Sequence, residues 1–378
     1  MINLIASAIS TPPNAVSTTE LIAAMTYKLS PELINTISTL GVERRFSTLE
    51  NLPQFLCGEP MYATSSSTEM GVRAARRCIE EWGGDPRRVG LLIAATNTPA
   101  HLLPCLASEV MANLHGTLSR SISTVSMQAQ GCSVLLKTIE VAHWYLKVNP
   151  DKLALILLSE AHTPYLTPLL SEDYFGYREI ARMRHSGLLD AEEAERRRMD
   201  TTFMVQAMLF GDGAVALLVG REEGLAEFGP IEHLTNDEPG DVELLAMGGG
   251  SLQPCSSGAR PIYLMRPAVP NRGAHYAVTT VRRVLSRPDS PVSSLDEVSG
   301  CLIHTGSKKI LDGVCTQLAL APESARVRTS YDILQRYGNL SSASTGFMLA
   351  DEHRRQGAAV VVGFGVGFTA SAGVVNFN

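Results

Sequence analysis

The stretch Cys132–Ser159, CSVLLKTIEVAHWYLKVNPDKLALILLS, joins a helical pattern to a buried strand. Its first part has apolar residues at positions 134, 135, 136, 139, 142 and 146, close to the 3.6-residue repeat of a helix. This spacing predicts a helix that has Cys132 in its first turn. The run Lys152–Ser159 is almost wholly apolar, which is typical of a strand buried on both faces. A helix followed by such a strand indicates an α/β fold.

Similar patterns lie on both sides of this stretch. Arg88–Thr96 reads as another buried strand, and Val298–Gly306 resembles it in length and apolar content. Ala358–Gly363 resembles the Lys152–Ser159 strand in the same way. These echoes predict a duplicated β/α unit. The segment Ala207–Val219 is predicted to form two strands joined by its Gly-Asp-Gly turn, since glycine tolerates positive φ.

The composition is that of an ordinary globular protein. Hydrophobic residues make up 45% and charged residues 19% of the 378 positions, so disordered, collagen-like and coiled-coil classes are excluded. The formal net charge is −6, and no run of basic residues is longer than three, which argues against a nucleic-acid or anionic-membrane partner. Glycines interrupt the most apolar stretch, 358–375, so no membrane span is predicted. The expected partner is a small molecule or another protein.

The cysteines and histidines predict neither a metal site nor a disulfide framework. The seven cysteines are an odd number and include no C-x-x-C pair, and the histidines show no metal-ligand spacing. The apolar N-terminus lacks the basic region of a secretory signal. Together these features favour a reducing, cytoplasmic location. The cysteines are Cys57, Cys78, Cys105, Cys132, Cys255, Cys301 and Cys315.

Three regions are predicted along the chain. Residues 1–170 form an N-terminal half, 171–200 a charged helical insertion, and 201–378 a C-terminal half. The insertion contains DAEEAERRR at 190–198, where Glu192 and Arg196, and Glu193 and Arg197, are spaced as helical ion pairs. One interpretation is a solvated helical insertion. The other is a lid over a site or an element that docks a partner.

Four elements could carry chemistry. Cys132 opens a helix, where the macrodipole stabilises a thiolate. His304 ends an apolar strand, Asn339 lies in a loop of small residues, and the glycines of Gly363–Thr369 would let backbone N–H groups approach a reacting carbonyl. Each has a structural alternative: a packed cysteine, a core histidine, an asparagine in a turn or helix cap, and a β-bulge.

Taken together with two further motifs, these elements resemble the ketosynthase III and type III polyketide synthase branch of the thiolase superfamily. The resemblance runs nearly end to end. It implies a thiolase fold of two similar α/β halves in a five-layered α-β-α-β-α arrangement, and a homodimer. The matching segments, in chain order, are Gly41–Arg45 (GVERR), Gly131–Cys132, Leu209–Ala214 (LFGDGA), His304, Tyr337–Ala343 (YGNLSSA) and Gly363–Gly367 (GFGVG).

The resemblance also implies an activity. Cys132 would take an acyl group from a coenzyme A or carrier-protein thioester, with no metal and no bound cofactor. His304 and Asn339 would stabilise the enolate formed when a malonyl-type thioester loses carbon dioxide, and this carbanion would attack the acyl group. The implied catalytic residues are therefore Cys132, His304 and Asn339, and the implied substrate-binding residues are Ser133, Val366 and Gly367.

Other readings stay open. The same cysteine thioester could acylate an oxygen, nitrogen or unusual carbon nucleophile without decarboxylation. An inactive subunit of a heteromer and a cysteine hydrolase are further alternatives. Two departures from the family bear on substrate: residues 133–137 (SVLLK) are bulkier than in relatives, and residues 35–40 lack the Trp or basic residues with which relatives hold coenzyme A. Specialised polyketide or fatty-acyl metabolism is the favoured setting.

Overall fold

The structure is a computed structural model that describes residues 2–248, 263–352 and 355–378, and a nine-stranded mixed sheet runs through it. Cys255 and His353 lie outside the described residues. In spatial order the strands are β13 (Gly300–Ile303), β14 (Gly357–Gly365), β15 (Thr369–Phe377), β10 (Ala226–Thr235), β1 (Ile2–Ser10), β9 (Gly213–Gly220), β7 (Leu153–Glu160), β5 (Val89–Thr96) and β6 (Ser123–Gln128).

The sheet consists of two sets of strands with the same pairing order. From β1 outward, β9 and β7 pair antiparallel and β5 and β6 pair parallel. From β10 outward, β15 and β14 pair antiparallel and β13 pairs parallel. The sets meet where β1 pairs antiparallel with β10. Strands β5 and β13 are thus equivalent, as are β7 and β14, which confirms the echo between the two halves of the sequence.

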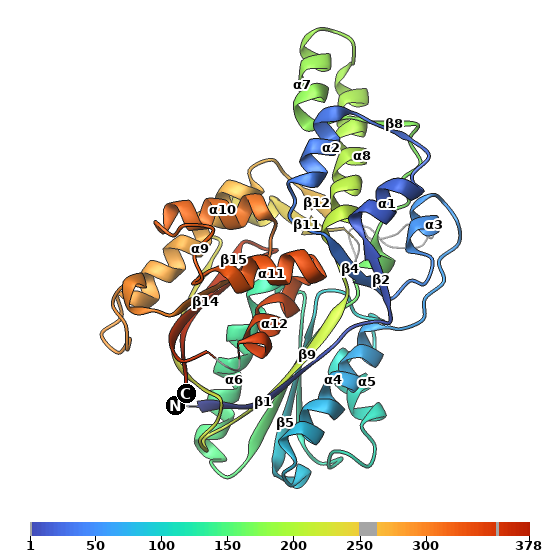
Figure 1. Ribbon diagram of the computed structural model, residues 1–378. Coiled ribbons are helices and arrows are strands. Elements are labelled where there is room, and N and C mark those ends of the chain that lie inside the picture. The colour runs from blue at the N-terminus through green and yellow to red at the C-terminus, as the bar shows by residue number, and fades with distance from the viewer. Residues whose placement is uncertain (1, 249–262, 353–354) are drawn as a thin grey trace.

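Helices form three layers around this sheet (Figure 1). One layer packs outside β1, β9, β7 and β5, and another packs outside β10, β14 and β15. The third lies between the two sets of strands, which gives the five-layered α-β-α-β-α arrangement. In that order the layers are α4 (Ser67–Trp82) with α5 (Leu106–Asn113), α9 (Val269–Leu285) with α10 (Lys308–Gln317), and α6 (Val134–Val148) with α12 (Ser344–Asp351). Helix α11 (Arg328–Tyr337) packs beside α12.

The central helices are buried on more than one face because strands enclose them from both sides. Val134, Ile139 and Leu146 of α6 belong to one apolar cluster with Phe347 and Leu349 of α12 and with residues of both strand sets. Removing these side chains from water is the main driving force for this arrangement. The predicted helix is confirmed, although a 3₁₀ turn, η2 (Gly131–Ser133), precedes it.

One predicted element is wrong. Ala207–Val219 does not form two strands, because helix α8 (Ala191–Leu209) runs through its first residues and only β9 follows the Gly-Asp-Gly segment. The apolar residues 207–209 are the buried last turn of α8. A short apolar run fits a buried helix end as well as a strand, so periodicity could not separate the two.

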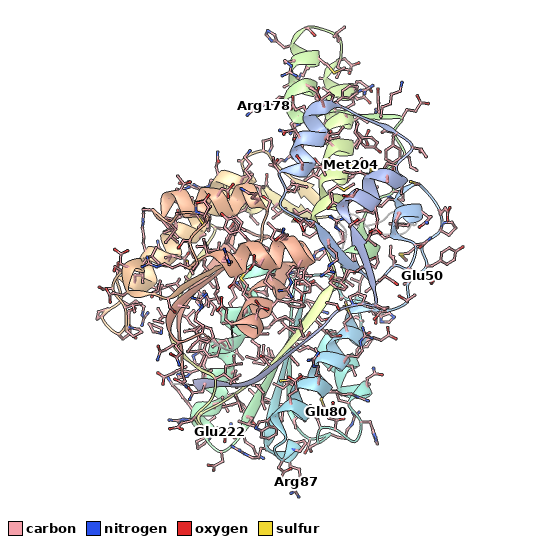
Figure 2. All side chains as sticks on the ribbon, in the orientation of Figure 1. Glu50, Glu80, Arg87, Arg178, Met204 and Glu222 are labelled. Carbon is pink, nitrogen blue, oxygen red and sulfur yellow. The ribbon has the colours of Figure 1, made fainter. Side chains whose placement is uncertain are left out.

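A group of smaller elements surrounds α8 and projects from the layers (Figure 1). Helix α7 and the first turns of α8 point away from the body, and Figure 2 places Arg178 of α7 there, far from Glu80 and Arg87. Of the described helices, none is both long and apolar enough to cross a membrane. The group comprises α1 (Thr18–Ala24), α2 (Pro31–Ser38), α3 (Leu52–Leu56), α7 (Tyr177–His185), β2 (Asn14–Ser17), β3 (Lys28–Leu29), β4 (Arg44–Ser47), β8 (Asp173–Tyr174), β11 (Leu245–Met247) and β12 (Tyr263–Met265).

The segment 171–200 contains β8, α7 and the start of α8. Of the two ion pairs predicted there, Glu193–Arg197 forms at 2.8 Å. Arg196 pairs with Glu193 and Asp200 in place of Glu192. The boundaries 1–170, 171–200 and 201–378 stay predictions.

Candidate active site

Cys132 lies in turn η2, at the entrance to helix α6. The preceding Gly131 has a φ of 68°, and its N–H donates to Asn97 Oδ1 at 3.0 Å. The Cys132 side chain is buried, and its Sγ lies 3.5 Å from the Ser341 hydroxyl. The turn therefore presents the thiol to the opposite half of the molecule.

The end of β14 passes directly against this turn. A Cβ on Gly365 would lie 2.9 Å from Cys132 Sγ and 3.1 Å from the Cys132 backbone nitrogen. A Cβ on Gly363 would lie 2.5 Å from the Cys132 carbonyl oxygen. Glycine is required at both positions by this close approach. The predicted glycine-rich segment thus lies beside the thiol.

His304 follows β13, so it sits at the carboxyl end of a strand, as predicted. Its backbone N–H donates to the Val362 carbonyl at 2.9 Å. The buried ring packs edge-on against Phe364, with 5.5 Å between centroids, and Nδ1 has no hydrogen-bond partner among the described residues. The imidazole is held by packing and by its backbone.

Asn339 is fixed by the chain around it. Its backbone N–H donates to the Leu209 carbonyl at 2.9 Å, and its own carbonyl accepts from the Gly211 N–H at 3.2 Å. The side-chain Oδ1 accepts the Ser341 N–H at 2.8 Å, while Nδ2 makes a long 3.4 Å contact to the Gly306 carbonyl. Since Oδ1 is engaged by a backbone donor, the NH₂ group is the part of this amide left for a substrate oxygen.

Cys132, His304 and Asn339 come together in one cavity of about 70 Å³. Cys132 belongs to the β1 side of the molecule, whereas His304 and Asn339 come from the β10 side. The walls are mostly apolar. They include Leu209, Phe210, Leu245, Met265, Val269, Gly273, Tyr276, Gly306, Ile310, Ser341, Phe364, Gly365, Val366, Phe368 and Thr369.

The three predicted substrate-binding residues are placed differently. Val366 lines the cavity. Ser133 is buried, and its hydroxyl shares a 2.6 Å hydrogen bond with the Thr369 hydroxyl. Gly367 follows Val366 with a φ of 73° and is not among the described lining residues.

A larger cavity of about 1140 Å³ adjoins the first, since Leu209, Met265, Val269, Gly306 and Ile310 line both. Helices α2, α7, α8 and α10 supply much of its wall. The hairpin of α7 and α8 thus borders the route from the surface to Cys132. Basic side chains dominate the charged lining: Arg178, Arg184, Arg198, Arg266 and Lys309 face Glu32 and Glu195.

Burial controls the titration of the cysteine and the histidine. It raises the pKa of the Cys132 thiol to about 12, with a smaller raising effect from the Glu160 carboxylate, although a hydrogen bond to Ser341 opposes it. Burial lowers the pKa of His304 to about 3. A low cysteine pKa was expected from the helix start, but desolvation outweighs that effect. The free site therefore holds a neutral thiol and a neutral imidazole.

Sequence reasoning missed three neighbours of the thiol: Asn97, Glu160 and Ser341. Asn97 follows β5 and Glu160 ends β7, so both stand at carboxyl ends of parallel strands, where α/β proteins place their sites. That position was a usable signal. Ser341 has a φ of 50°, which no sequence pattern indicated.

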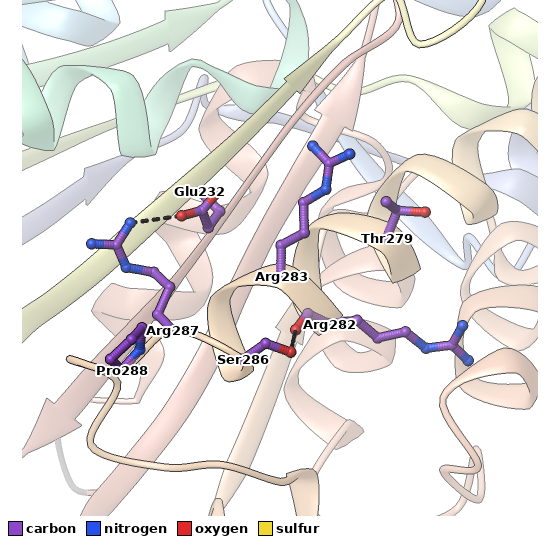
Figure 3. A pocket seen from close by; sticks show the side chains of 7 residues that line it. All are labelled: Glu232, Thr279, Arg282, Arg283, Ser286, Arg287 and Pro288. Carbon is purple, nitrogen blue, oxygen red and sulfur yellow. Dashed lines mark hydrogen bonds and ion pairs between the residues drawn. The ribbon is translucent and has the colours of Figure 1, made fainter.

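A separate surface pocket lies at the C-terminal end of α9 (Figure 3). Figure 3 shows Arg287 directed at Glu232, to which it is ion-paired at 2.6 Å. Arg287 also pairs with Asp289 at 2.8 Å. Among the described residues this pocket shares no wall with the Cys132 cavity and contains no nucleophilic thiol.

Comparisons with known proteins agree with this geometry. Residues 292–377 match the family described as 3-oxoacyl-[acyl-carrier-protein (ACP)] synthase III C terminal, and this segment includes His304 and Asn339. The β-ketoacyl-[acyl-carrier-protein] synthase III of Sphingopyxis alaskensis is 26% identical over 316 residues, which cover 82% of this chain and 84% of that protein. The chain is therefore similar to β-ketoacyl-[acyl-carrier-protein] synthase III proteins over most of its length.

Two solved structures show that the chain has the thiolase fold. The C-terminal type III polyketide synthase domain of Steely1 from Dictyostelium matches with a TM-score of 0.75 at 17% identity, covering all of this chain and 99% of that domain. The priming β-ketosynthase of the R1128 polyketide pathway matches with a TM-score of 0.73 at 21% identity, over all of this chain and 96% of that one. The predicted fold class is confirmed.

Proposed function

We propose that the chain is an acyltransferase of the ketosynthase type, which joins an acyl group to a malonyl-type unit. In the first step Cys132 Sγ attacks the carbonyl of an acyl thioester while its proton passes to the neutral His304 imidazole. The carrier sulfur leaves and takes up that proton. The acyl group is then held as a thioester on Cys132.

In the second step a malonyl-type thioester loses carbon dioxide, and the electron pair left behind forms an enolate. N–H groups of His304 and Asn339 donate to the enolate oxygen. The enolate carbon attacks the thioester on Cys132, the carbon–sulfur bond breaks, and the sulfur leaves as a thiol after taking a proton. Backbone N–H groups of Cys132 and the Gly365–Gly367 segment would hold the oxyanion of this attack.

The observation that carries this proposal is the convergence of a thiol, an imidazole and an amide in one apolar cavity. An amide donates a hydrogen bond without accepting the proton, which suits stabilisation of an enolate. A carboxylate at position 339 would favour base chemistry instead. The apolar walls exclude water, which would hydrolyse the acyl-enzyme.

The substrates are proposed to arrive on coenzyme A or an acyl carrier protein, and no bound cofactor or metal takes part. Both carriers bear phosphate groups on a pantetheine arm. The larger cavity supports this proposal because Arg184, Arg266 and Lys309 line the approach to Cys132. We propose that the chain acts in polyketide or specialised fatty-acyl biosynthesis.

A homodimer in the cytoplasm is also proposed. Strand β6 is an edge of the sheet, and its residues are exposed or half-buried, whereas those of β7 are fully buried. Leu102 and Leu103, in the loop after β5, are 82% and 86% exposed. An unpaired edge beside exposed leucines fits pairing with a second copy. Leu103→Asp should weaken self-association in analytical ultracentrifugation, and an unchanged sedimentation profile would contradict the proposed interface.

The alternative activity transfers the Cys132 acyl group to an oxygen, nitrogen or other carbon nucleophile without decarboxylation. The neutral amide of Asn339 favours condensation over this reaction, because direct acylation of a hydroxyl or amine calls for a base. The two activities differ in whether carbon dioxide is released from a malonyl donor.

The test is intact-protein mass spectrometry after incubation with acyl thioesters on both carriers, followed by malonyl thioester. We expect an acyl adduct that is absent from Cys132→Ala, and its disappearance with release of carbon dioxide when the malonyl donor is added. Cys105→Ala is the matched control, since this half-buried cysteine lies outside the cavity. Absence of any Cys132-dependent adduct would overturn the proposal.

A further inference from the structure

Asn97 joins three chain segments that meet at the thiol. Its Oδ1 accepts the Gly131 N–H at 3.0 Å, and its Nδ2 donates to Glu160 Oε1 and to the Ser341 hydroxyl, both at 3.0 Å. The backbone N–H of Asn97 also donates to the Glu160 carboxylate. A backbone N–H can only donate and a carboxylate can only accept, so these partners fix which way the amide is turned. Every polar atom of the side chain is used.

Two of these segments contact Cys132 directly. Gly131 is its neighbour in the chain, and the Ser341 hydroxyl lies 3.5 Å from its Sγ. Ser341 in turn donates its backbone N–H to Asn339 Oδ1. Asn97 therefore links the cysteine turn to the turn that carries the substrate-facing amide, although Asn97 itself is not among the described residues that line the cavity.

The third segment brings a buried carboxyl group, whose pKa is raised by its burial. Glu160 is fully buried, and Thr98 and Ser342 hydroxyls complete its hydrogen bonds. His162 Nε2 lies 3.8 Å from its carboxyl group, and Glu160 contributes to raising the pKa of both Cys132 and Tyr165. Like charges raise one another's pKa in such surroundings, and a carboxylate near a thiol opposes the thiolate. The neutral amide of Asn97 satisfies this carboxylate without adding charge.

We propose that Asn97 is a positioning residue for the nucleophile: it holds the Gly131–Cys132 turn and Ser341 together and supplies uncharged hydrogen-bond donors to the Glu160 carboxyl group beside the thiol. This role rests on the proposed function of Cys132 as the acyl acceptor. It does not depend on which acyl group or carrier is used.

The test combines an isosteric variant of Asn97 with a double variant in which positions 97 and 160 exchange their amide and carboxyl groups. Asn97→Asp keeps an acceptor for Gly131 but loses both donors and places a second carboxylate against Glu160. We expect its iodoacetamide alkylation at Cys132, followed by peptide mass spectrometry from pH 7 to 10, to be at least about tenfold slower at each pH, with the curve displaced to higher pH. Glu160→Gln should displace the curve to lower pH. The double variant N97D/E160Q restores one amide and one carboxylate, so it should recover most of the wild-type rate.

Asn113→Asp makes the same charge change at an exposed position on α5 and should leave the curve unchanged. Loosening of the fold would expose the thiol and speed its alkylation, which is the opposite direction. If Asn97→Asp does not fold, Asn97→Ser replaces it and should slow acylation of Cys132. Overlapping curves for wild type and Asn97→Asp, or a double variant no faster than Asn97→Asp, would overturn the role. Alkylation reports on Asn97 even if no acyl thioester labels Cys132, so failure of the proposed function is seen separately.

Discussion

Turns η2 and η7 (Ser341–Ala343) lead into the two central helices, yet they reach a left-handed backbone in different ways. At Gly131, φ is 68° and a side chain has no room, because a Cβ would lie 2.7 Å from the Val366 carbonyl oxygen. At Ser341, φ is 50° and the side chain is used, since its hydroxyl contacts both Asn97 and Cys132. Turn η2 requires a residue without a side chain, whereas turn η7 is held by hydrogen bonds to the Ser341 side chain.

This difference between the two turns corresponds to two tasks of the site: one turn holds the thiol and the other orients the Asn339 amide. A non-glycine residue in this region costs about 1–3 kcal/mol and persists only where its surroundings hold it. Here the Ser341 N–H donates to Asn339 Oδ1, so the strained residue also orients the amide that faces substrate. The cysteine turn is thus fixed by packing against the end of β14 and by one hydrogen bond to Asn97, whereas the amide turn is fixed by a polar network. Changes to the two turns should therefore have separable effects.

The largest separable effect is expected from Asn339→Ala. Loss of this donor should slow condensation by about 10²–10³-fold, as for removal of one donor to a developing oxyanion, while Cys132 is still acylated. Carbon dioxide release and the acyl adduct, measured on the same sample, check this. Equal loss of both steps would show that the two turns do not divide the reaction.

Much of this arrangement follows from the sequence. The apolar spacing of α6 and the runs in β5 and β7 predict an α/β fold, since periodicity reports burial directly, whereas the five-layered arrangement was implied by the family resemblance. Cys132, His304 and Asn339 were candidates because of their local positions, and the family resemblance implied their catalytic roles. Asn97 and Glu160 share such positions, but one asparagine and one glutamate after strands carry no distinctive pattern.

Two properties could not be predicted because they arise from contacts between the halves. The high pKa of the Cys132 thiol comes from burial by β14 and by the Asn339 loop, which are distant in sequence. Ser341, which has a φ of 50°, is hydrogen-bonded to Asn97, which lies 244 positions away. A local sequence pattern therefore predicts neither the pKa of Cys132 nor the φ of Ser341.

Next in size is Gly131→Ala. The strained φ costs about 1–2 kcal/mol and the contact with Val366 about 1–3 kcal/mol more, so the free energy of unfolding should fall by at least about 2 kcal/mol. Gly116→Ala is the matched control, since Gly116 has a φ of 80° with nothing within 4 Å of a Cβ. Urea unfolding of both variants separates backbone strain from the clash. Equal losses would show that packing against β14 does not shape η2.

The pH dependence of His304 gives a smaller effect on the amide side of the site. Burial lowers the pKa of His304 to about 3 in the folded protein, against about 6.5 for an exposed histidine, so between these pH values the unfolded chain binds a proton that the folded chain does not. Stability from this residue is therefore lost as pH falls below 6.5, by up to about 1.4 kcal/mol per pH unit. The His304→Gln variant should not lose stability in this way, because glutamine does not titrate. The wild-type minus variant difference in urea unfolding should shrink between pH 6.5 and 5, and a constant difference would contradict a buried neutral imidazole.

The smallest effect, and the sharpest test of the comparison, is expected from Ser341→Gly. Glycine relieves the positive φ, which stabilises the fold by about 1 kcal/mol, but it removes hydroxyl hydrogen bonds of about the same value. The free energy of unfolding should then change by less than about 1 kcal/mol. Ser341→Ala keeps the strain and loses the same bonds, so it should be less stable than Ser341→Gly. If Ser341→Ala were the more stable of the two, the φ of 50° would not be strained, and η7 would be held by packing just as η2 is.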